Sequence, residues 1–260
     1  MPETRHNEGL RVERRPDGVC VLVLDRPQRR NALTDELLLA LGRELTAIAA
    51  DPDVRVVILA GADGVFSAGG DFDQIATLGV TSESQVAEGL SQIMRASTLL
   101  WALPQPSIAV VDGAAVGAGM SLALACDVRI ASPSAMLLPS FIRMGLVPDC
   151  GATWLLPRLI GTGAALRMLL EGRPVDAAAA QQLGLVSQVH ENPLDQALEL
   201  AAVFARHPLA AAATKRLLRE AADGGLAAAI DHEAVAQAAA FARGEFADNF
   251  EIWRSSRIAD

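Results

Sequence analysis

The sequence predicts an α/β protein in which buried strands alternate with helices. Short runs rich in Val and Leu, bounded by Pro, Gly or Asp, are typical of strands. These runs alternate with longer segments whose apolar residues recur at helical spacing. Repeated strand–turn–helix units of this kind place helices outside a sheet. With 260 residues, 51% of them hydrophobic, the chain can bury a large core.

The first quarter of the chain shows this alternation clearly. Residues Gly18–Asp25 form the first expected strand, because they are rich in Val and Leu. Thr34 is the expected N-cap of a helix, and the segment Leu37–Ile48 carries its apolar face. An Asp-Pro-Asp breaker then ends the helix, and a second strand is expected at Val54–Ala60.

The same order returns in the middle of the chain. A helix is expected at Ser84–Ala102, followed by prolines and a strand at Ser107–Val111. A glycine-rich turn, Gly113–Gly119, leads into a short helix, Met120–Cys126, and then into a strand at Asp127–Ala131. Two successive units of this kind indicate one continuous core.

The last third of the chain is rich in Ala and Leu, a composition that favours helix. One more strand-like run lies at Leu185–Val189. We therefore expect residues 1–190 to form the core that holds the active site, and residues 191–260 to form a helical oligomerisation region. The second expectation follows because helices that are hydrophobic on more than one face indicate burial against another subunit. The expected helices are Leu194–Arg206, Leu209–Ala222 and Ala227–Arg243.

Composition excludes several classes of function. The net charge of −9 argues against nucleic acid or an anionic membrane as the main partner. The three cysteines and four histidines lack the spacing of a metal site, so no metal is expected. The polar N-terminus does not resemble a signal peptide, and no uncharged stretch is suited to span a bilayer. A soluble cytoplasmic protein is the expectation.

Two glycine-rich turns, residues 61–71 and 112–119, each lie between a strand and a helical segment. Small residues in such turns let backbone N–H groups approach a ligand, and a helix that begins there adds partial positive charge. Two convergent N–H donors can form an oxyanion hole that polarises a carbonyl. The alternative is that both turns serve packing alone, and spacing does not decide between these interpretations.

Together these segments resemble the enoyl-CoA hydratase/isomerase family, also called the crotonase superfamily. The likeness covers about Gly18–Arg257, nearly the whole chain, and its strength lies in the order of several motifs. These are Leu24–Pro27 with Arg30–Leu33, Phe66–Asp71, Val111–Gly119 followed by Leu124–Asp127, Gly145–Asp149 and Leu156–Gly161.

The resemblance implies a spiral of ββα units followed by a helical trimerisation region, and a homotrimer or a dimer of trimers. It implies an acyl-CoA thioester substrate, with coenzyme A as part of the substrate and no separate cofactor. The thioester oxygen would be held by the N–H groups of Gly70 and Ala118, although Ala118 stands where many relatives have glycine. Asp71 is interpreted as a brace of its loop rather than as a proton-transfer group.

The resemblance also separates members of the family by their acids and bases. Hydratases use two glutamates, and this chain has Ser121 and Phe141 at those positions. Neither side chain transfers protons near pH 7, so hydration by two carboxylates is not expected. Asp149 falls where isomerases of the family place their catalytic aspartate, and residues 140–154 most resemble the ring-1,2-epoxyphenylacetyl-CoA isomerase branch.

A lone carboxylate suits isomerisation, because one base can remove a proton from one carbon and return it two carbons away. Phe141 and Leu146 are expected to give Asp149 an apolar wall that raises its pKa. The structural alternative is that Asp149 only caps a helix that begins near Gly151.

Three functions remain open on the sequence. The first is an enoyl-CoA isomerase that uses Asp149 to move a proton through a dienolate. The second is an enoyl-CoA hydratase of low activity, with Glu83 or Glu88 replacing a missing glutamate. The third is a non-catalytic scaffold that binds CoA thioesters. A dehalogenase is disfavoured, because no histidine lies between His6 and His190.

The resemblance also suggests residues that contact the substrate. Guanidinium groups pair well with phosphates, so Arg29 and Arg30, beside Arg26, are candidates for the nucleotide of CoA. Near the C-terminus Trp253 is a candidate for the CoA of a neighbouring subunit, although Ser256 replaces the expected lysine. The acyl group is not readable, because the segment Ile75–Glu88 has no firm predicted conformation. The remaining candidates for substrate contact are Ala32, Ala68, Asp71 and Phe141.

Overall fold

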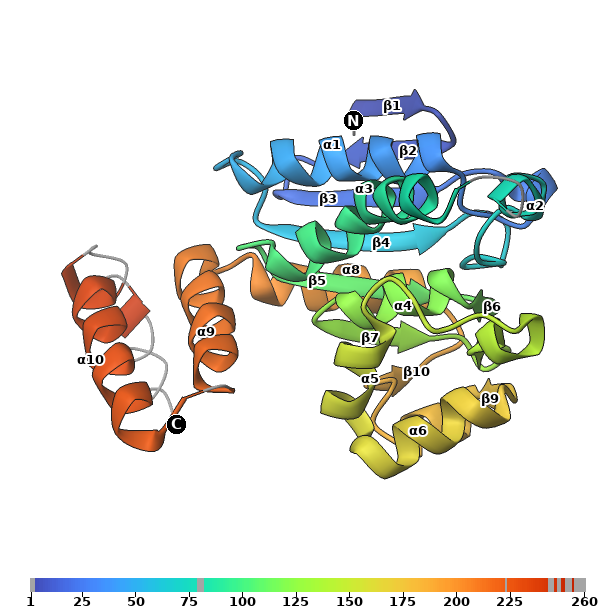
Figure 1. Ribbon diagram of the computed structural model, residues 1–260. Coiled ribbons are helices and arrows are strands. Elements are labelled where there is room, and N and C mark those ends of the chain that lie inside the picture. The colour runs from blue at the N-terminus through green and yellow to red at the C-terminus, as the bar shows by residue number, and fades with distance from the viewer. Residues whose placement is uncertain are drawn as a thin grey trace. The chain divides into compact units, whose positions relative to one another are not determined.

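The computed structural model describes residues 3–78, 82–222, 224–242, 246, 249–250 and 254. The chain divides into two compact units, Met1–Arg206 and His207–Asp260, and each is described by itself. The first unit is a mixed α/β fold, which confirms the predicted class (Figure 1).

A seven-stranded sheet forms the centre of the first unit, in the order β1-β2-β3-β4-β5-β7-β10. Strands β3, β4, β5, β7 and β10 run parallel, whereas β1 and β2 add an antiparallel edge. The strands expected from apolar runs are present because those runs are buried on both faces. The bounds are β1 Glu3–Asn7, β2 Leu10–Arg14, β3 Val19–Leu24, β4 Val56–Gly61, β5 Ser107–Val111, β7 Val128–Ala131 and β10 Gln188–Val189.

Helices cover both faces of this sheet. On one face Leu22 and Leu59 pack in a cluster that includes the apolar side of α1 (Asp35–Ala49). The other face, which includes Val21 and Ile58, packs against alanines of one later helix. Alternate strand residues therefore supply two separate cores. The remaining helices of the unit are α2 Phe72–Leu78, α3 Glu83–Ala102, α4 Ala118–Ala125, α5 Ala152–Ile160, α6 Thr162–Glu171, α7 Ala177–Gln182 and α8 Pro193–Phe204.

A second, three-stranded sheet has the order β6-β8-β9. It joins β6 (Ala114–Val116), β8 (Met136–Leu138) and β9 (Val175–Asp176). Of these strands, β6 lies within the expected glycine-rich turn Gly113–Gly119. Short 3-10 helices cover Pro27–Arg29 and Ser140–Met144. The glycine-rich turn thus contains a strand that fixes the backbone before α4 begins.

The second unit contains α9 (Pro208–Ala221) and α10 (Leu226–Ala242), two of the three helices expected in the last third. The third, α8, belongs to the first unit, because Ala197, Ala201 and Ala205 pack on the sheet. The compact units therefore divide after Arg206, whereas the sequence had placed the boundary after residue 190.

The N-terminal hairpin of β1 and β2 was not expected from the sequence. Strand β1 is exposed along its whole length, and only Leu10 and Val12 of β2 are buried. A strand without an apolar face carries no periodic signal. Within the described residues, no helix is long and apolar enough to cross a membrane.

Candidate active site

Backbone hydrogen bonds join the two glycine-rich turns side by side. The N–H of Ser67 donates to the carbonyl of Ala114 at 3.0 Å, and the N–H of Val116 donates to the carbonyl of Ser67 at 2.9 Å. These bonds form a parallel bridge between Ser67 and Ala115. The turns, which are distant in the sequence, are thus held in a fixed register at the ends of β4 and β5.

Glycines make this close approach possible. Gly69 has a φ of +90°, and a Cβ placed there would lie 2.8 Å from the carbonyl oxygen of Val116. A Cβ at Gly119 would lie 2.6 Å from the Cβ of Ser67. Side chains at either position would push the two turns apart, so the sequence pattern reflects a real steric requirement.

The amides of Gly70 and Ala118 are available to a ligand. A parallel bridge between Leu33 and Gly70 uses the N–H of Leu33 and the N–H of Asp71, and it leaves the Gly70 amide on the other side of its strand. Ala118 is the first residue of α4, where N–H groups have no partner within the helix. Among the described residues neither amide donates a hydrogen bond.

Gly70 and Ala118 line one cavity of about 300 Å³, and Asp149 lines the same cavity. The three residues come from a loop after β4, the start of α4 and the turn before α5. The structure therefore brings together the two proposed oxyanion donors and the proposed acid–base group. This combination can polarise a carbonyl and exchange a proton near it.

The Asp149 side chain is partly buried, and only one of its two carboxyl oxygens lacks a hydrogen-bond partner. Its Oδ1 atom has no hydrogen-bond partner among the described residues. Burial raises the pKa of this carboxyl, and hydrogen bonds involving Cys150 and the backbone of Asp149 oppose the rise only in part. The N-cap of α5 is Gly151, with a φ of +86° and no side-chain cap. The interpretation of Asp149 as only a helix cap finds no support in this geometry.

Asp71, which lines the same cavity, is fully engaged. Its Oδ2 accepts a hydrogen bond from Arg26 Nη1 at 3.1 Å, and its Oδ1 accepts one from the N–H of Asp73 at 3.1 Å. Arg26 also donates to the carbonyl of Ala32 at 2.6 Å. These contacts agree with a bracing role for Asp71 in the first turn.

The two positions that hold glutamates in hydratases offer no proton-transfer group. Ser121 is fully buried and donates to the carbonyl of Gly117, one turn earlier in α4. Phe141 is buried, and a Cβ at Gly117 would lie 3.7 Å from its ring. Neither residue lines the cavity.

The apolar wall of the cavity differs from the one expected. Phe141 lies beneath Gly117, and Leu146 is 45% exposed, so neither forms a wall around Asp149. The wall comes instead from Leu33, before α1, and from α1, α2 and α3, all far from Asp149 in the sequence. Its apolar residues are Leu33, Leu38, Ile75, Val86, Leu90, Ile93 and Met94.

The segment with no firm predicted conformation, Ile75–Glu88, is largely helical where it is described. Glu83 and Glu88 are exposed on α3 and do not line the cavity, so the structure does not support either as a replacement acid. A carboxylate that the sequence analysis missed, Asp35, does line it. Asp35 lies in the first turn of α1 and is exposed to solvent, but partial desolvation of its carboxyl group and then the neighbouring Glu36 carboxylate raise its pKa.

The proposed CoA turn is ordered by Asn31, another residue whose role was missed. Asn31 is fully buried with a φ of +55°. Its amide donates to the carbonyls of Ala62 at 2.9 Å and Val65 at 2.6 Å, and its Oδ1 accepts from the N–H of Arg26. Asn31 thereby ties the turn to the end of β4.

The candidate CoA contacts lie around this turn but outside the cavity. Arg29 forms an exposed ion pair with Asp73, and Arg30 is exposed. Ala32 is buried, and Ala68 donates its N–H to the carbonyl of Arg30 at 2.9 Å. None of these four candidates lines the cavity. Trp253 and Ser256 lie outside the described residues.

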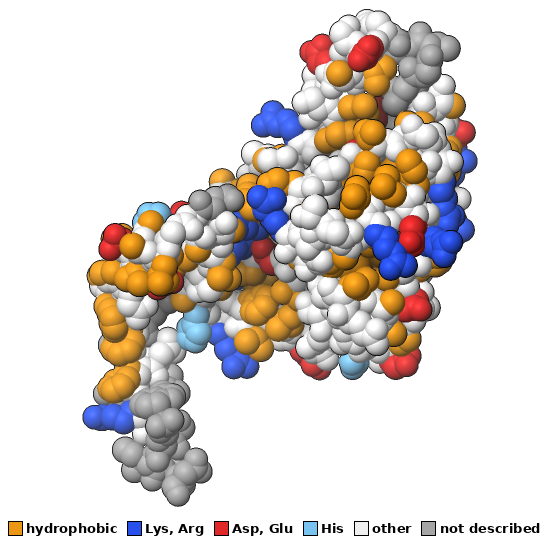
Figure 2. All heavy atoms as spheres, turned by 60° about the horizontal axis from the view of Figure 1, so that its bottom comes forward, with side chains coloured by type: hydrophobic (Ala, Val, Ile, Leu, Met, Phe, Trp, Pro, Cys, Tyr) orange, Lys and Arg blue, Asp and Glu red, His pale blue; other side chains and the backbone are white. Residues whose placement is uncertain are grey.

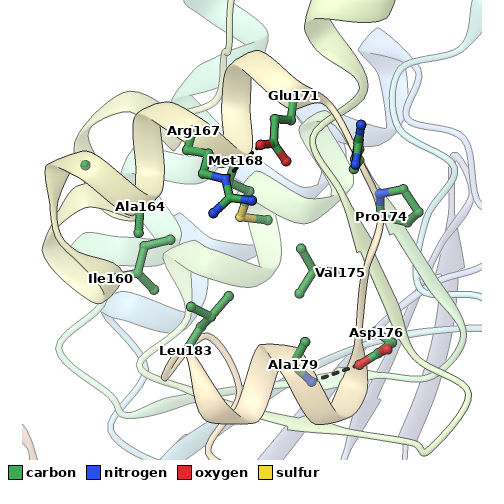
Figure 3. Close-up of a pocket in the computed structure, with 12 residues that line it drawn as sticks. Ile160, Ala164, Arg167, Met168, Glu171, Pro174, Val175, Asp176, Ala179 and Leu183 are labelled. Atoms are coloured by element: carbon green, nitrogen blue, oxygen red, sulfur yellow. Dashed lines mark hydrogen bonds and ion pairs between the residues drawn. The ribbon is translucent and has the colours of Figure 1, made fainter.

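A larger cavity, about 560 Å³, lies between α6 and α7 (Figure 3). Its apolar floor includes Met168 and Val175, and its rim carries an ion pair between Arg167 and Glu171. It contains none of the predicted site residues, so its size does not make it the candidate active site. Within the described residues, no group of three or more His, Cys, Asp or Glu side chains is arranged to hold a metal ion.

Comparisons with known proteins show the family to which the chain belongs. The model of the enoyl-CoA hydratase/isomerase family matches residues 14–252. The probable enoyl-CoA hydratase EchA14 of Mycobacterium tuberculosis is 41% identical over 203 residues, which span 76% of this chain and 78% of the relative. The 1,2-epoxyphenylacetyl-CoA isomerase of Escherichia coli is 35% identical over 201 residues, 74% of each chain.

Solved structures show the same likeness. A putative enoyl-CoA hydratase from Streptomyces coelicolor superposes with a TM-score of 0.91 at 35% identity, covering 98% of this chain and 94% of the other. A putative enoyl-CoA hydratase from Thermobifida fusca, in complex with acetoacetyl-CoA, has a TM-score of 0.82 at 33% identity and covers 90% and 95%. The chain therefore belongs to the enoyl-CoA hydratase/isomerase family of acyl-CoA enzymes.

Proposed function

We propose that this protein is an enoyl-CoA isomerase that moves a double bond with a single carboxyl group. The observation that carries the proposal is the position of Asp149: it lies in one cavity with the amides of Gly70 and Ala118, and its Oδ1 atom is buried without a partner. In this cavity Asp71 is held by Arg26 in an ion pair, whereas Asp149 has no ion-pair partner among the described residues.

The proposed reaction begins when the thioester oxygen accepts hydrogen bonds from the two amides. Polarisation of the carbonyl acidifies the carbon next to it, and Asp149 removes a proton from that carbon. The negative charge passes to the thioester oxygen of a dienolate, where the amides stabilise it. Asp149, now protonated, returns the proton two carbons away, so the bond shifts and the carboxylate is restored. In a ring-epoxide substrate Asp149 would instead assist ring expansion.

A buried carboxyl group suits this cycle because it must act as a base and then as an acid. Desolvation raises the pKa of Asp149. Its carboxylate form is therefore a stronger base than that of an exposed aspartate, and its protonated form can still act as an acid. The value of kcat/KM should fall as the pH drops through this raised pKa, because the Asp149 carboxylate becomes protonated in the free enzyme.

Hydration of an enoyl-CoA is the second candidate, and the name of the probable hydratase EchA14 favours it. It requires a group that activates water, and the positions of Ser121 and Phe141 offer none. Asp35, at the exposed end of α1, is the remaining carboxyl group of the cavity that could assist. A non-catalytic scaffold is the third candidate, and it gives no reason for an unpartnered buried carboxyl group.

One experiment separates these candidates. The enzyme is incubated with a panel of 3-enoyl, 2-enoyl and ring-epoxide CoA thioesters, and the products are assigned by mass as isomerised or hydrated. The proposal predicts isomerised product from the 3-enoyl or ring-epoxide thioester and slow hydration of the 2-enoyl thioester. Fast hydration supports the hydratase, and no product from any substrate, together with tight binding, supports the scaffold.

We also infer that the second unit packs against other copies of the chain. The helices α9 and α10 expose large apolar side chains that a monomer would leave in water (Figure 2). Light scattering tests this inference: a trimer or hexamer is expected, and a monomer would contradict it. The most exposed of these side chains are Leu218, Leu226, Ile230, Val235 and Phe241.

A further inference from the structure

A second cavity, about 490 Å³, lies beside the candidate active site, between α3 and α5. It shares two lining residues, Met94 and Cys150, with the cavity that holds Asp149. The two cavities are therefore adjacent. The mechanism proposed above does not use the second cavity.

Two tryptophans give this cavity an aromatic lining. The rings of Trp101 and Trp154 meet edge to face, with centroids 5.1 Å apart and an interplanar angle of 84°. Arg158 places its guanidinium 3.7 Å from the centroid of the Trp154 ring, which holds that ring in place. Paired aromatic side chains fixed in this way present a preorganised surface for a planar apolar group.

The same cavity contains a buried hydroxyl group without a satisfactory partner. Ser97 is 5% exposed, and its Oγ atom has no hydrogen-bond partner of normal geometry among the described residues. The Cys150 thiol is a polar neighbour of this hydroxyl. Burial raises the pKa of that thiol to about 12, and the Ser97 hydroxyl offsets the rise only in part, so the thiol stays neutral and is a weak partner. A polar atom of a ligand would satisfy the hydroxyl.

Three consecutive residues, Asp149, Cys150 and Gly151, contribute to the linings of the two cavities. Cys150 has a φ of +50° and Gly151 a φ of +86°, so the chain turns sharply immediately after Asp149. Asp149 consequently lines the first cavity, whereas Gly151 lines the second. Met94 lines both cavities and is half-buried. Its side chain is unbranched, so a change of rotamer can open space between the two cavities.

We propose that the second cavity receives the far end of the acyl group, and that this end is an aromatic ring with a hydrogen-bonding substituent such as a hydroxyl. The ring packs against Trp101 and Trp154, and its substituent exchanges a hydrogen bond with Ser97. The acyl chain enters past Met94 and Cys150 from the thioester end. This inference rests on the proposed function, because the thioester must lie at Gly70, Ala118 and Asp149.

Binding of unreactive, saturated thioesters tests the inference without any need for turnover. The probes are butyryl-CoA, 4-phenylbutyryl-CoA and 4-(4-hydroxyphenyl)butyryl-CoA, with dissociation constants measured by calorimetry on the full chain. The wild-type protein should bind the phenyl probe about tenfold more tightly than butyryl-CoA, and the hydroxyphenyl probe about threefold to tenfold more tightly again.

Two variants assign these gains to the cavity. Ser97→Ala should remove the preference for the hydroxyl group and leave the affinity for the phenyl probe within about twofold. Thr98→Trp, at an exposed lining position, should fill the cavity and reduce the affinity of both ring probes to that of butyryl-CoA. Ser84→Ala, at an exposed position on the same helix, is the matched control and should change none of the three values.

The outcomes separate this inference from the proposed function. If butyryl-CoA binds but the ring probes gain nothing, the second cavity is not an acyl subsite and the proposed function stands. If the rings gain affinity equally in the wild type and in Thr98→Trp, the ring binds elsewhere and the inference is wrong. If butyryl-CoA itself fails to bind, both proposals are wrong.

Discussion

Two aspartates line the same cavity and differ in almost every contact. Asp71, in the first glycine-rich turn, accepts hydrogen bonds from Arg26 and from the N–H of Asp73. Asp149, in the turn before α5, has a buried Oδ1 atom without a partner. The carboxylate of Asp71 is satisfied by the protein and holds a loop together, whereas Asp149 lines the cavity with one carboxyl oxygen that no protein donor satisfies. Residue type and location alone would not distinguish them.

The largest expected effect is on turnover. Asp149→Asn keeps the shape of the side chain but removes the group that transfers the proton. We expect kcat for isomerisation to fall by about a thousandfold or more, with acyl-CoA affinity unchanged within about tenfold. Turnover and calorimetric binding measure the two quantities separately.

Asp35→Asn is the matched control for this change, because Asp35 is the other carboxyl group of the cavity that has a raised pKa. Its loss should reduce turnover by less than about tenfold, since it is exposed at the end of α1. An equal loss of turnover in both variants would show that Asp35 and Asp149 share the chemistry. The contrast between Asp71 and a single unsatisfied carboxyl group would then be wrong.

The next effect concerns the rigidity of the turn that carries Asp71. Gly69→Ala introduces a Cβ 2.8 Å from the carbonyl oxygen of Val116 at a φ of +90°. We expect the free energy of unfolding to fall by about 2–4 kcal/mol, measured by urea denaturation. Gly163→Ala, in α6 with no atom within 4 Å of the new Cβ, should be neutral or slightly stabilising. Similar values for both variants would refute the close contact between the two turns.

A smaller loss of stability is expected at Asp71 itself. Asp71→Asn leaves the Arg26 guanidinium, whose side chain is 19% exposed, without its anionic partner. The free energy of unfolding should fall by about 2–3 kcal/mol, at the low end for a buried pair because Arg26 keeps some contact with water. Asp73→Asn removes the exposed pair with Arg29 and should cost about 1 kcal/mol or less. A fully stable Asp71→Asn enzyme without turnover would place Asp71 in the chemistry.

The smallest effect is a gain of stability from the substitution of Asp149. Burial raises the pKa of Asp149 in the folded state, so the folded protein binds the proton more tightly than the unfolded chain does. The stability linked to this group is present at low pH and is lost as the pH rises through the folded-state pKa. Asp149→Asn should therefore raise the Tm by about 2–4 °C at pH 7–8, and the gain should vanish as the pH falls below that pKa. A gain that persists at low pH would contradict the account of the buried charge.

The fold could be predicted wherever burial leaves a pattern in the sequence. The strand at Ser107–Val111 and the helix capped by Thr34 have the predicted positions, because one is buried on both faces and the other on a single apolar side. The β1–β2 hairpin was missed because most of its residues face water. Strand β10 is shorter than the expected run Leu185–Val189, because only Gln188 and Val189 pair with β7. Leu185 and Val186 are buried but precede the strand, so their apolar character reports burial and not strand pairing.

The sequence predicts the local backbone geometry of the two glycine-rich turns but not the surroundings of Asp149. The requirements of Gly69 and Gly119 are local and steric, so the glycine pattern reports them. The wall of the cavity arises from helices distant in the sequence, which no local pattern around Asp149 reveals.

Buried polar residues were the second kind of omission. Arg129 is 4% exposed, and its guanidinium donates to the carbonyls of Leu185 at 2.5 Å and Cys126 at 2.7 Å. It thereby joins the end of α4 to the segment before β10, and burial lowers its pKa. A charged residue in a strand-like run gives no sign of such carbonyl partners, because they are assembled only when the chain folds.

The most direct test of the central claim is a crystal structure of the Asp149→Asn enzyme with a 3-enoyl-CoA substrate bound. The account predicts that the thioester oxygen lies about 2.7–3.1 Å from the amide nitrogens of Gly70 and Ala118. It also predicts that the side chain at position 149 lies about 3–3.5 Å from the two carbons that exchange the proton. A thioester oxygen bound elsewhere, or a side chain at position 149 that points away from the acyl chain, would contradict it.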